Sequence, residues 1–256
     1  MIGANHHLLL NIPYDLVRAN MDKVAALGIG IEVFVDNQAA NDVDIPDARS
    51  MGKELANRGI VCTVHAPFMD LSPGAIDVEV RAVSREKIKR SIGIANQLGA
   101  RGIVCHGAYD RWRFDGREDR WLSNSIETWT EALKEAGDLP VMIENIFEEE
   151  PSVIIALFDH FQGKNLRFCF DTGHFNLFTT VPLSDWLVPL KDVLMEFHVH
   201  DNNGKSDEHL PVGMGTFPFR ELKGFIKSMT GTYFAAETHS EGAALETIKR
   251  AKEFLS

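Results

Sequence analysis

Short apolar runs rich in β-branched residues alternate with longer amphipathic stretches from one end of the chain to the other. Short apolar runs are typical of buried strands, and an apolar period of about 3.6 residues is typical of a helix packed on one face. The apolar runs predict eight strands, at residues 2–6, 30–35, 60–65, 102–107, 141–145, 167–171, 194–200 and 233–238. The amphipathic stretches predict helices at residues 13–27, 46–58, 76–98, 118–137, 151–162, 183–191, 218–229 and 240–255.

This regular series of βα units favours a closed fold. Parallel strands joined by helices form either a (β/α)8 TIM barrel or an open, doubly wound sheet. The open sheet is expected to carry a glycine-rich phosphate loop after its first strand, and residues 3–6 do not form one. No linker rich in proline or serine interrupts the series. We therefore predict an α/β protein in which residues 1–256 form a single TIM-barrel domain.

Composition narrows the classes of partner and compartment. The chain has 26 basic and 37 acidic residues and a formal net charge of -11, so it lacks a general attraction for nucleic acid. Its 3 cysteines are dispersed, which fits a reducing compartment. No segment approaches the roughly 18 uninterrupted apolar residues of a membrane span, and no signal-peptide pattern is present. We expect a cytoplasmic protein without a membrane partner.

Polar residues gather at the predicted ends of the strands. In a TIM barrel, catalytic residues come from the carboxyl ends of the strands. Six of the eight predicted strands end in histidine, glutamate or aspartate. Because side chains alternate across a strand with period two, these residues can be assigned to the inner face of the barrel. The inward-facing residues are His65, His106, Glu144, Asp171, His198 and Glu237.

This convergence of carboxylates and imidazoles indicates a metal site. Unpaired carboxylates buried close together would repel one another and shift toward protonation. A divalent cation removes this conflict, and a shell of imidazole and carboxylate suits zinc, manganese, iron or cobalt better than calcium or magnesium. A lone inward-facing Glu or His is more often an ordinary hydrogen-bonded residue, and we assign Glu32 and Glu196 to that class.

Taken together, the motifs resemble the xylose-isomerase-like TIM-barrel superfamily. This superfamily contains sugar and sugar-phosphate isomerases and epimerases, and also endonuclease IV. The resemblance covers essentially the whole chain, in the expected order. It rests on residues 64–67, 105–107, 143–145, 170–174, 198–202, 207–215 and 237–238.

The resemblance implies one of two metal layouts. Isomerases and epimerases hold one divalent metal, and their four ligands match Glu144, Asp171, His198 and Glu237. Endonuclease IV holds three zinc ions, and its nine ligands match these four residues and five others. The five additional matches, which could instead contact substrate, are His65, His106, His174, Asp207 and His209. We expect one ion of manganese, zinc or cobalt, and the sequence permits up to three.

The first functional hypothesis is isomerisation or epimerisation of a small keto sugar, sugar phosphate or related polyol. The resemblance implies that Glu144 and Glu237 exchange protons with the substrate through an enediolate, while the metal polarises its oxygens. An arginine that several epimerases use is replaced by Lys205 in the corresponding stretch. The residues that we expect to contact or cover the substrate are Phe68, Trp112, Arg113 and Lys205.

The alternative is an endonuclease IV-like phosphodiester hydrolase with three zinc ions. Residues 36–47, after the second strand, contain four aspartates and no basic residue, and they would repel a polyanion. We therefore expect a sugar-like small molecule and not DNA as the partner. A metal-containing barrel without turnover is the second alternative. Family members often form dimers or tetramers, so the resemblance allows a homo-oligomer.

Overall fold

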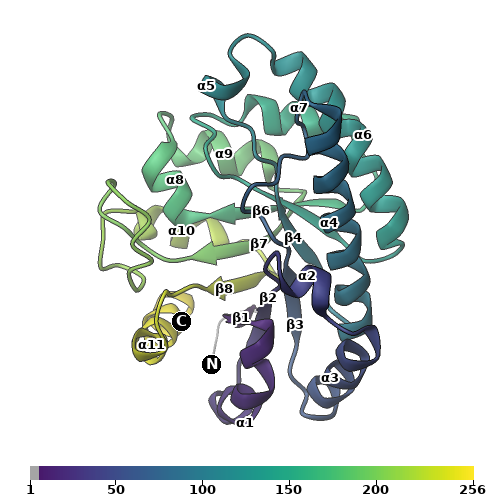
Figure 1. Ribbon diagram of the computed structural model, residues 1–256. Helices are drawn as coiled ribbons and strands as arrows, with labels where there is room; N and C mark the ends of the chain where they lie inside the picture. The colour runs from purple at the N-terminus through teal and green to yellow at the C-terminus, as the bar shows by residue number, and fades with distance from the viewer. Residues whose placement is uncertain (1–5) are drawn as a thin grey trace.

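Eight parallel strands pair in chain order, and β8 pairs with β1 to close a barrel (Figure 1). The computed structural model describes residues 6–256. The predicted TIM-barrel fold is confirmed, and β2 to β8 lie within two residues of their predicted bounds. The strands are β1 (His7–Pro13), β2 (Gly30–Phe34), β3 (Cys62–His65), β4 (Ile103–His106), β5 (Val141–Glu144), β6 (Leu166–Asp171), β7 (Leu194–Val199) and β8 (Tyr233–Ala236).

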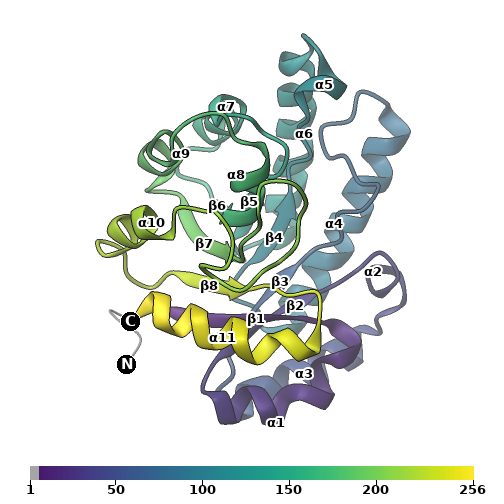
Figure 2. The same ribbon diagram turned by 90° about the vertical axis from the view of Figure 1, so that its left-hand side faces the viewer.

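The long helices pack around the outside of the strands (Figures 1 and 2). They correspond to the predicted helices, and none of those within residues 6–256 is both long and apolar enough to cross a membrane. They are α1 (Val17–Leu27), α3 (Ile45–Asn57), α4 (Val78–Leu98), α6 (Glu118–Ala136), α7 (Ser152–His160), α9 (Leu183–Leu190), α10 (Phe219–Ile226) and α11 (Glu241–Leu255).

Short helices follow several strands; the sequence pattern did not predict three of them, and the fourth, Tyr14–Leu16, lies at the start of the helix predicted at 13–27. They contain three to seven residues, which is too short for a helical period to be recognised. They shape the loops at the mouth of the barrel. These elements are η2 (Tyr14–Leu16), α2 (Ala39–Asp42), α5 (Arg111–Phe114) and α8 (Thr172–Phe178).

The first strand differs from the prediction. The expected strand at 2–6 lies, apart from its last residue, outside the described residues, and the observed strand is His7–Pro13. Its buried leucines, residues 8–10, supply the apolar run. Pro13 has φ −54° and ψ 142°, so it ends the extended strand, and it is also the N-cap of the turn Tyr14–Leu16 that runs into α1. Proline is tolerated where a strand ends, because the amide hydrogen it lacks is not needed there.

Alternating side chains separate the inside of the barrel from the layer beneath the helices. Phe168 of β6 points outward and packs against Trp186 of α9, with ring centroids 6.3 Å apart. Cys169 points inward into a small apolar cluster. Asp171, two residues further along the strand, therefore lies at the mouth of the barrel. The inner cluster consists of Val104, Met142 and Cys169.

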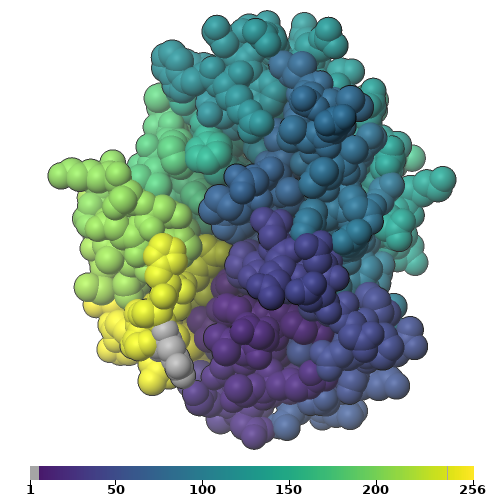
Figure 3. Space-filling view, in the orientation of Figure 1, coloured from purple at the N-terminus to yellow at the C-terminus, as the bar shows by residue number. Residues whose placement is uncertain are grey.

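The two ends of the chain meet where the barrel closes. Figure 2 shows α11 beside β1 and α1, and the C-terminal segment (yellow) borders the N-terminal segment (purple) on the surface in Figure 3. Lys252 of α11 donates a hydrogen bond from Nζ to the carbonyl oxygen of Leu27 over 2.8 Å. Closure therefore rests both on the pairing of β8 with β1 and on the last helix.

Close packing of α3 against α4 at Gly52 gives a stability prediction. A Cβ atom at Gly52 would lie 2.6 Å from the carbonyl oxygen of Gln97 and 2.8 Å from that of Leu98. Because the helices must move apart, we expect Gly52→Ala to lower the free energy of unfolding by about 1–3 kcal/mol in urea denaturation.

Gly93→Ala, in α4, is the matched control. A Cβ atom at Gly93 would meet nothing within 4 Å, and alanine is the better helix former by up to about 1 kcal/mol. Equal stability of the two variants would contradict the close approach of α3 and α4.

Candidate metal centre

The polar residues singled out at the strand ends lie together at the mouth of the barrel. β3, β4, β5 and β6 each end in one of them, as the period-two pattern predicts. Parallel closure brings these ends to one small volume, and the first turn of α8 and the loop after β7 add three more side chains. The residues are His65, His106, Glu144, Asp171, His174, His198, Asp207, His209 and Glu237.

Glu144 lies at the centre of this cluster, with its side chain 1% exposed. Its Oε2 atom is 3.2 Å from Nε2 of His65 and 3.1 Å from Nε2 of His106. Its Oε1 atom is 3.1 Å from Nδ1 of His174 and 3.3 Å from Nδ1 of His198. The two carboxylate oxygens therefore face different imidazoles. We call His65, His106 and Glu144 the first donor group; their ligand atoms lie within 4.8 Å of one another.

Three carboxylates surround Nδ1 of His198. This nitrogen lies 3.7 Å from Oδ2 of Asp171 and 3.5 Å from Oε1 of Glu237, in addition to its contact with Glu144. It is buried and has no hydrogen-bond partner among the described residues. An unpartnered nitrogen facing carboxylate oxygens is suited to sharing a cation with them. Glu144, Asp171, His198 and Glu237 form the second donor group.

The loop after β7 brings Asp207 to the cluster. Its Oδ2 atom is 2.9 Å from Nε2 of His209 and 3.7 Å from Nε2 of His174. An isolated antiparallel bridge between Asp201 and Leu210 holds the loop. We call His174, Asp207 and His209 the third donor group; the ligand atoms of His200, Asp207 and His209 lie within 4.8 Å of one another.

Further side chains orient the donors. Nε2 of His198 is 3.1 Å from Oε2 of Glu32, so that Nδ1 is turned toward the second donor group. Asn11 donates to the other oxygen of Glu32 over 2.8 Å. His200 lies with Nε2 2.9 Å from Oδ2 of Asp171. Carboxylates behind a ligating imidazole fix its orientation and raise its basicity. Glu32, assigned from the sequence to an ordinary hydrogen-bonded role, thus supports the cluster directly.

Opposite charges compensate one another within the buried cluster. Burial by itself raises the pKa of Glu144, but His198 and His106 outweigh it and hold that pKa well below the usual range. Burial lowers the pKa of His174, and the nearby carboxylates, Asp171 foremost, raise it well above the usual value. In the absence of another cation, protonated imidazoles balance the carboxylates, and a metal ion would compete with these protons.

The four residues expected to contact or cover the substrate are placed differently. Phe68 stacks on His106, with ring centroids 4.5 Å apart and planes at 17°. Trp112 is 76% exposed on α5, and Arg113 and Lys205 are also exposed. Within residues 6–256, only Phe68 of these four makes a hydrogen bond, ion pair or ring contact with the nine clustered residues.

The closed barrel and its polar mouth define a TIM-barrel protein with a cluster of potential metal ligands. The model of the xylose isomerase-like TIM barrel family matches residues 21–256. The chain therefore belongs to this family, and the resemblance drawn from its motifs is confirmed.

Individual relatives differ in what is known of them. The uncharacterized protein MJ1311 of Methanocaldococcus jannaschii is 30% identical over 188 residues, which cover 69% of this chain and 64% of that protein. The chain thus matches just under two thirds of that relative. A probable endonuclease 4 of Mycobacterium leprae is 24% identical over 230 residues, covering 83% of this chain and 85% of the relative.

Solved structures with the same fold include an epimerase-like protein and an endonuclease IV. A D-tagatose 3-epimerase-like protein superposes with a TM-score of 0.82 at 23% identity, covering 96% of this chain and 97% of the other. Endonuclease IV from Thermus thermophilus superposes with a TM-score of 0.72 at 16% identity, covering 97% of this chain and 98% of the other. At these identities the likeness shows the shared fold.

Metal analysis tests the third donor group. We expect protein reconstituted with zinc to hold about three ions per chain by mass spectrometry, and His209→Ala to hold about two. The matched control is His160→Ala, because His160 is an exposed residue at the end of α7. Unchanged zinc content in His209→Ala would contradict a third position.

Glu32→Gln tests the support behind His198. The amide keeps the size of the side chain but loses the charge that orients and polarises the imidazole, so we expect zinc affinity to fall by about 10–100-fold. Competition with a chromogenic chelator measures the change. If Glu32→Gln binds zinc as tightly as the unmodified protein, the contact between Glu32 and His198 does not tune the site.

Proposed function

We propose that this protein is a divalent-metal-dependent hydrolase of phosphoester bonds in small, sugar-like molecules. The observation that carries the proposal is the position of Glu144, whose two carboxylate oxygens face separate donor groups. A carboxylate divided in this way is suited to bridging two cations. Sites with neighbouring metal ions are well suited to displacement at phosphorus.

The donor set fits zinc, manganese or cobalt. Imidazole and carboxylate are the ligands these ions prefer, and they occur together in each of the three donor groups. Nδ1 of His198 and Oδ1 of Asp207 are buried and lack hydrogen-bond partners among the described residues, as expected for atoms reserved for a cation. When bound, divalent ions supply Lewis acidity toward phosphoryl oxygens and lower the pKa of water.

The surroundings of Glu144 support a metal-holding role for its carboxylate. Four imidazoles face its two oxygens, and its side chain is 1% exposed. Its role in the proposed reaction is to hold the first and second donor groups at a fixed separation. Phe68 covers the ring face of His106 and limits the access of water to this side.

The rim of the mouth favours a small substrate over DNA. Beside the carboxyl ends of β1 and β2, a cavity of about 570 Å³ is lined by five aspartates and no basic residue. Negative charge here would repel the continuous backbone of a duplex. Arg113, on α5 after β4, offers positive charge on another part of the rim, whereas Arg111 is paired with Glu149 over 2.8 Å. The aspartates are Asp15, Asp36, Asp42, Asp44 and Asp47.

Isomerisation or epimerisation of a small keto sugar is the second candidate. The second donor group alone would hold one ion for that chemistry, and an epimerase-like protein shares the fold with a TM-score of 0.82. In this case Glu144 and Glu237 would exchange protons, and Trp112, Arg113 and Lys205 would close over the sugar. A barrel that binds metal without turnover is the third hypothesis.

Glu144→Gln tests the proposed function. We expect metal-loaded protein to hydrolyse bis(p-nitrophenyl) phosphate and Glu144→Gln to lose at least about 100-fold in kcat/KM, because the neutral amide cannot bridge two donor groups. The matched control is Glu253→Gln on the exposed face of α11, which should retain full activity.

Two parallel assays can overturn the proposed hydrolase function. Interconversion of ketose epimers, followed by NMR, together with inactivity on phosphoesters would favour the second candidate. Cleavage of an abasic duplex faster than that of small phosphoesters would show that the acidic rim does not exclude DNA.

A further inference from the structure

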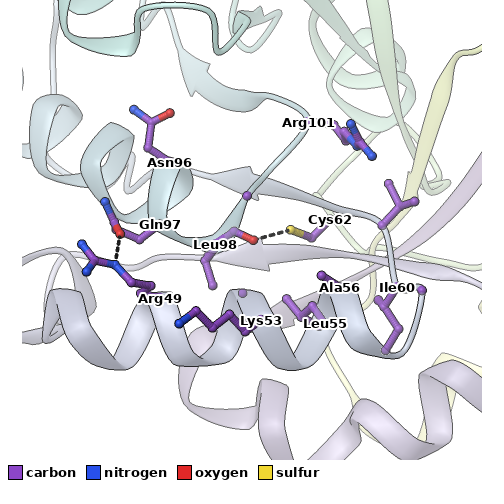
Figure 4. A pocket seen from close by; sticks show the side chains of 14 residues that line it. Arg49, Lys53, Leu55, Ala56, Ile60, Cys62, Asn96, Gln97, Leu98 and Arg101 are labelled. Carbon is purple, nitrogen blue, oxygen red and sulfur yellow. Dashed lines mark hydrogen bonds between the residues drawn. The ribbon is translucent and has the colours of Figure 1, made fainter.

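A separate cavity lies at the amino-terminal ends of β3 and β4, opposite the candidate metal centre. It has a volume of about 410 Å³ and is formed by α3, α4 and the segments that lead into the two strands (Figure 4). Pockets that bind small molecules commonly have volumes of about 300–1,000 Å³. None of the nine residues of the metal cluster lines this cavity.

The charge of the cavity is opposite to that of the chain. Its lining includes Arg49, Lys53 and Arg101 but no aspartate or glutamate, although the formal net charge of the protein is -11. Within residues 6–256, none of these three cations forms an ion pair with a carboxylate. Other surface arginines do: Arg18, for example, lies 2.7 Å from Asp47. Uncompensated positive charge at a concave surface favours an anionic ligand.

The cations lie around the ends of the cavity. Figure 4 shows Arg49 and Lys53 at one end and Arg101 at the other. Nε of Arg49 donates to Oε1 of Gln97 over 2.8 Å, which fixes the guanidinium and leaves its terminal nitrogens available. Arg49 and Lys53 precede the last turn of α3 (Ile45–Asn57), so the dipole at the end of that helix does not account for their presence.

The surface between the cations is uncharged and combines apolar with polar groups. Leu55, Ala56 and Leu98 contribute to it, and the thiol of Cys62 contacts the carbonyl oxygen of Leu98 at 3.8 Å. Burial raises the pKa of Cys62 to about 12, so this thiol carries no negative charge that would oppose an anion. The amide of Gln97 and nearby helix-end carbonyls can exchange hydrogen bonds with hydroxyl groups.

We propose that this cavity binds a small phosphorylated polyol. The phosphate of this ligand lies against Arg101 or at the end formed by Arg49 and Lys53. The carbon chain of the ligand covers the apolar surface, and its hydroxyl groups form hydrogen bonds with the polar groups of α4. The site is independent of the proposed hydrolase function, because it lies at the other end of the barrel and shares no residue with the metal cluster.

Isothermal titration calorimetry of the full chain in its metal-free form tests this site, because glycerol 3-phosphate also belongs to the substrate class proposed for the metal centre. The probes are glycerol 3-phosphate, inorganic phosphate and glycerol. We expect glycerol 3-phosphate to bind more tightly than inorganic phosphate and glycerol not to bind. Replacing both Lys53 and Arg101 with alanine should weaken the binding of glycerol 3-phosphate by at least about tenfold, because two charge-assisted contacts are lost.

Two further variants separate the cavity from other phosphate sites. Ala56→Trp fills the cavity from an exposed helix position without changing charge, and should cause a similar loss of affinity. Lys164→Ala, an exposed lysine outside the cavity, should bind as the unmodified protein does. All these variants should retain the phosphoesterase activity, so failure of this proposal is distinguishable from failure of the proposed function.

Unchanged affinity in both the double variant and Ala56→Trp would place phosphate elsewhere and overturn the site. Inorganic phosphate binding as tightly as glycerol 3-phosphate would overturn the assignment of a polyol.

Discussion

Buried negative charge at the mouth of the barrel is the constraint on which the candidate site depends. Glu144, Asp171 and Glu32 lie at 1% exposure or less, where an unpaired carboxylate would be strongly unfavourable. Imidazoles from other strands meet these oxygens at hydrogen-bond distances or slightly beyond. The arrangement is stable only with positive charge between the carboxylates, supplied either by protons on histidine or by metal ions. That requirement makes the mouth a candidate site for metal ions.

The barrel meets this constraint through strand geometry. Because every strand is parallel, all the carboxyl ends point to the same mouth, and the period-two alternation turns one side chain from each end inward. Apolar residues such as Met142 fill part of the level beneath, where Glu196 is also buried and accepts a hydrogen bond from Thr63 over 3.0 Å. The outer layer, where Phe168 packs on Trp186, keeps the strands fixed. The fold therefore determines where most of the potential metal ligands lie, and the loop after β7 adds the remaining ones.

Sequence reasoning predicted the repeated elements better than the features made by distant contacts. β2 to β8 and six of the clustered residues follow from local periodicity and the rule for barrel mouths, whereas His174, Asp207 and His209 are implied only by the family resemblance. The strand His7–Pro13 was not predicted, because Pro13 marks the boundary before the first helix and at the same time ends this strand. The interaction of Glu32 with His198 joins residues 166 positions apart and leaves no local signal. The basic cavity could not be predicted from the sequence either, because it forms only where α3 packs against α4.

The central claim is that Glu144 bridges two cation positions. Anomalous diffraction at the zinc absorption edge, from crystals of the zinc-loaded protein, tests it most directly. The account predicts separate anomalous peaks on the two sides of the Glu144 carboxylate, one beside His65 and His106 and the other beside Asp171 and Glu237. A single peak in contact with only one oxygen of Glu144, with the histidine side empty, would contradict it and favour a one-metal enzyme.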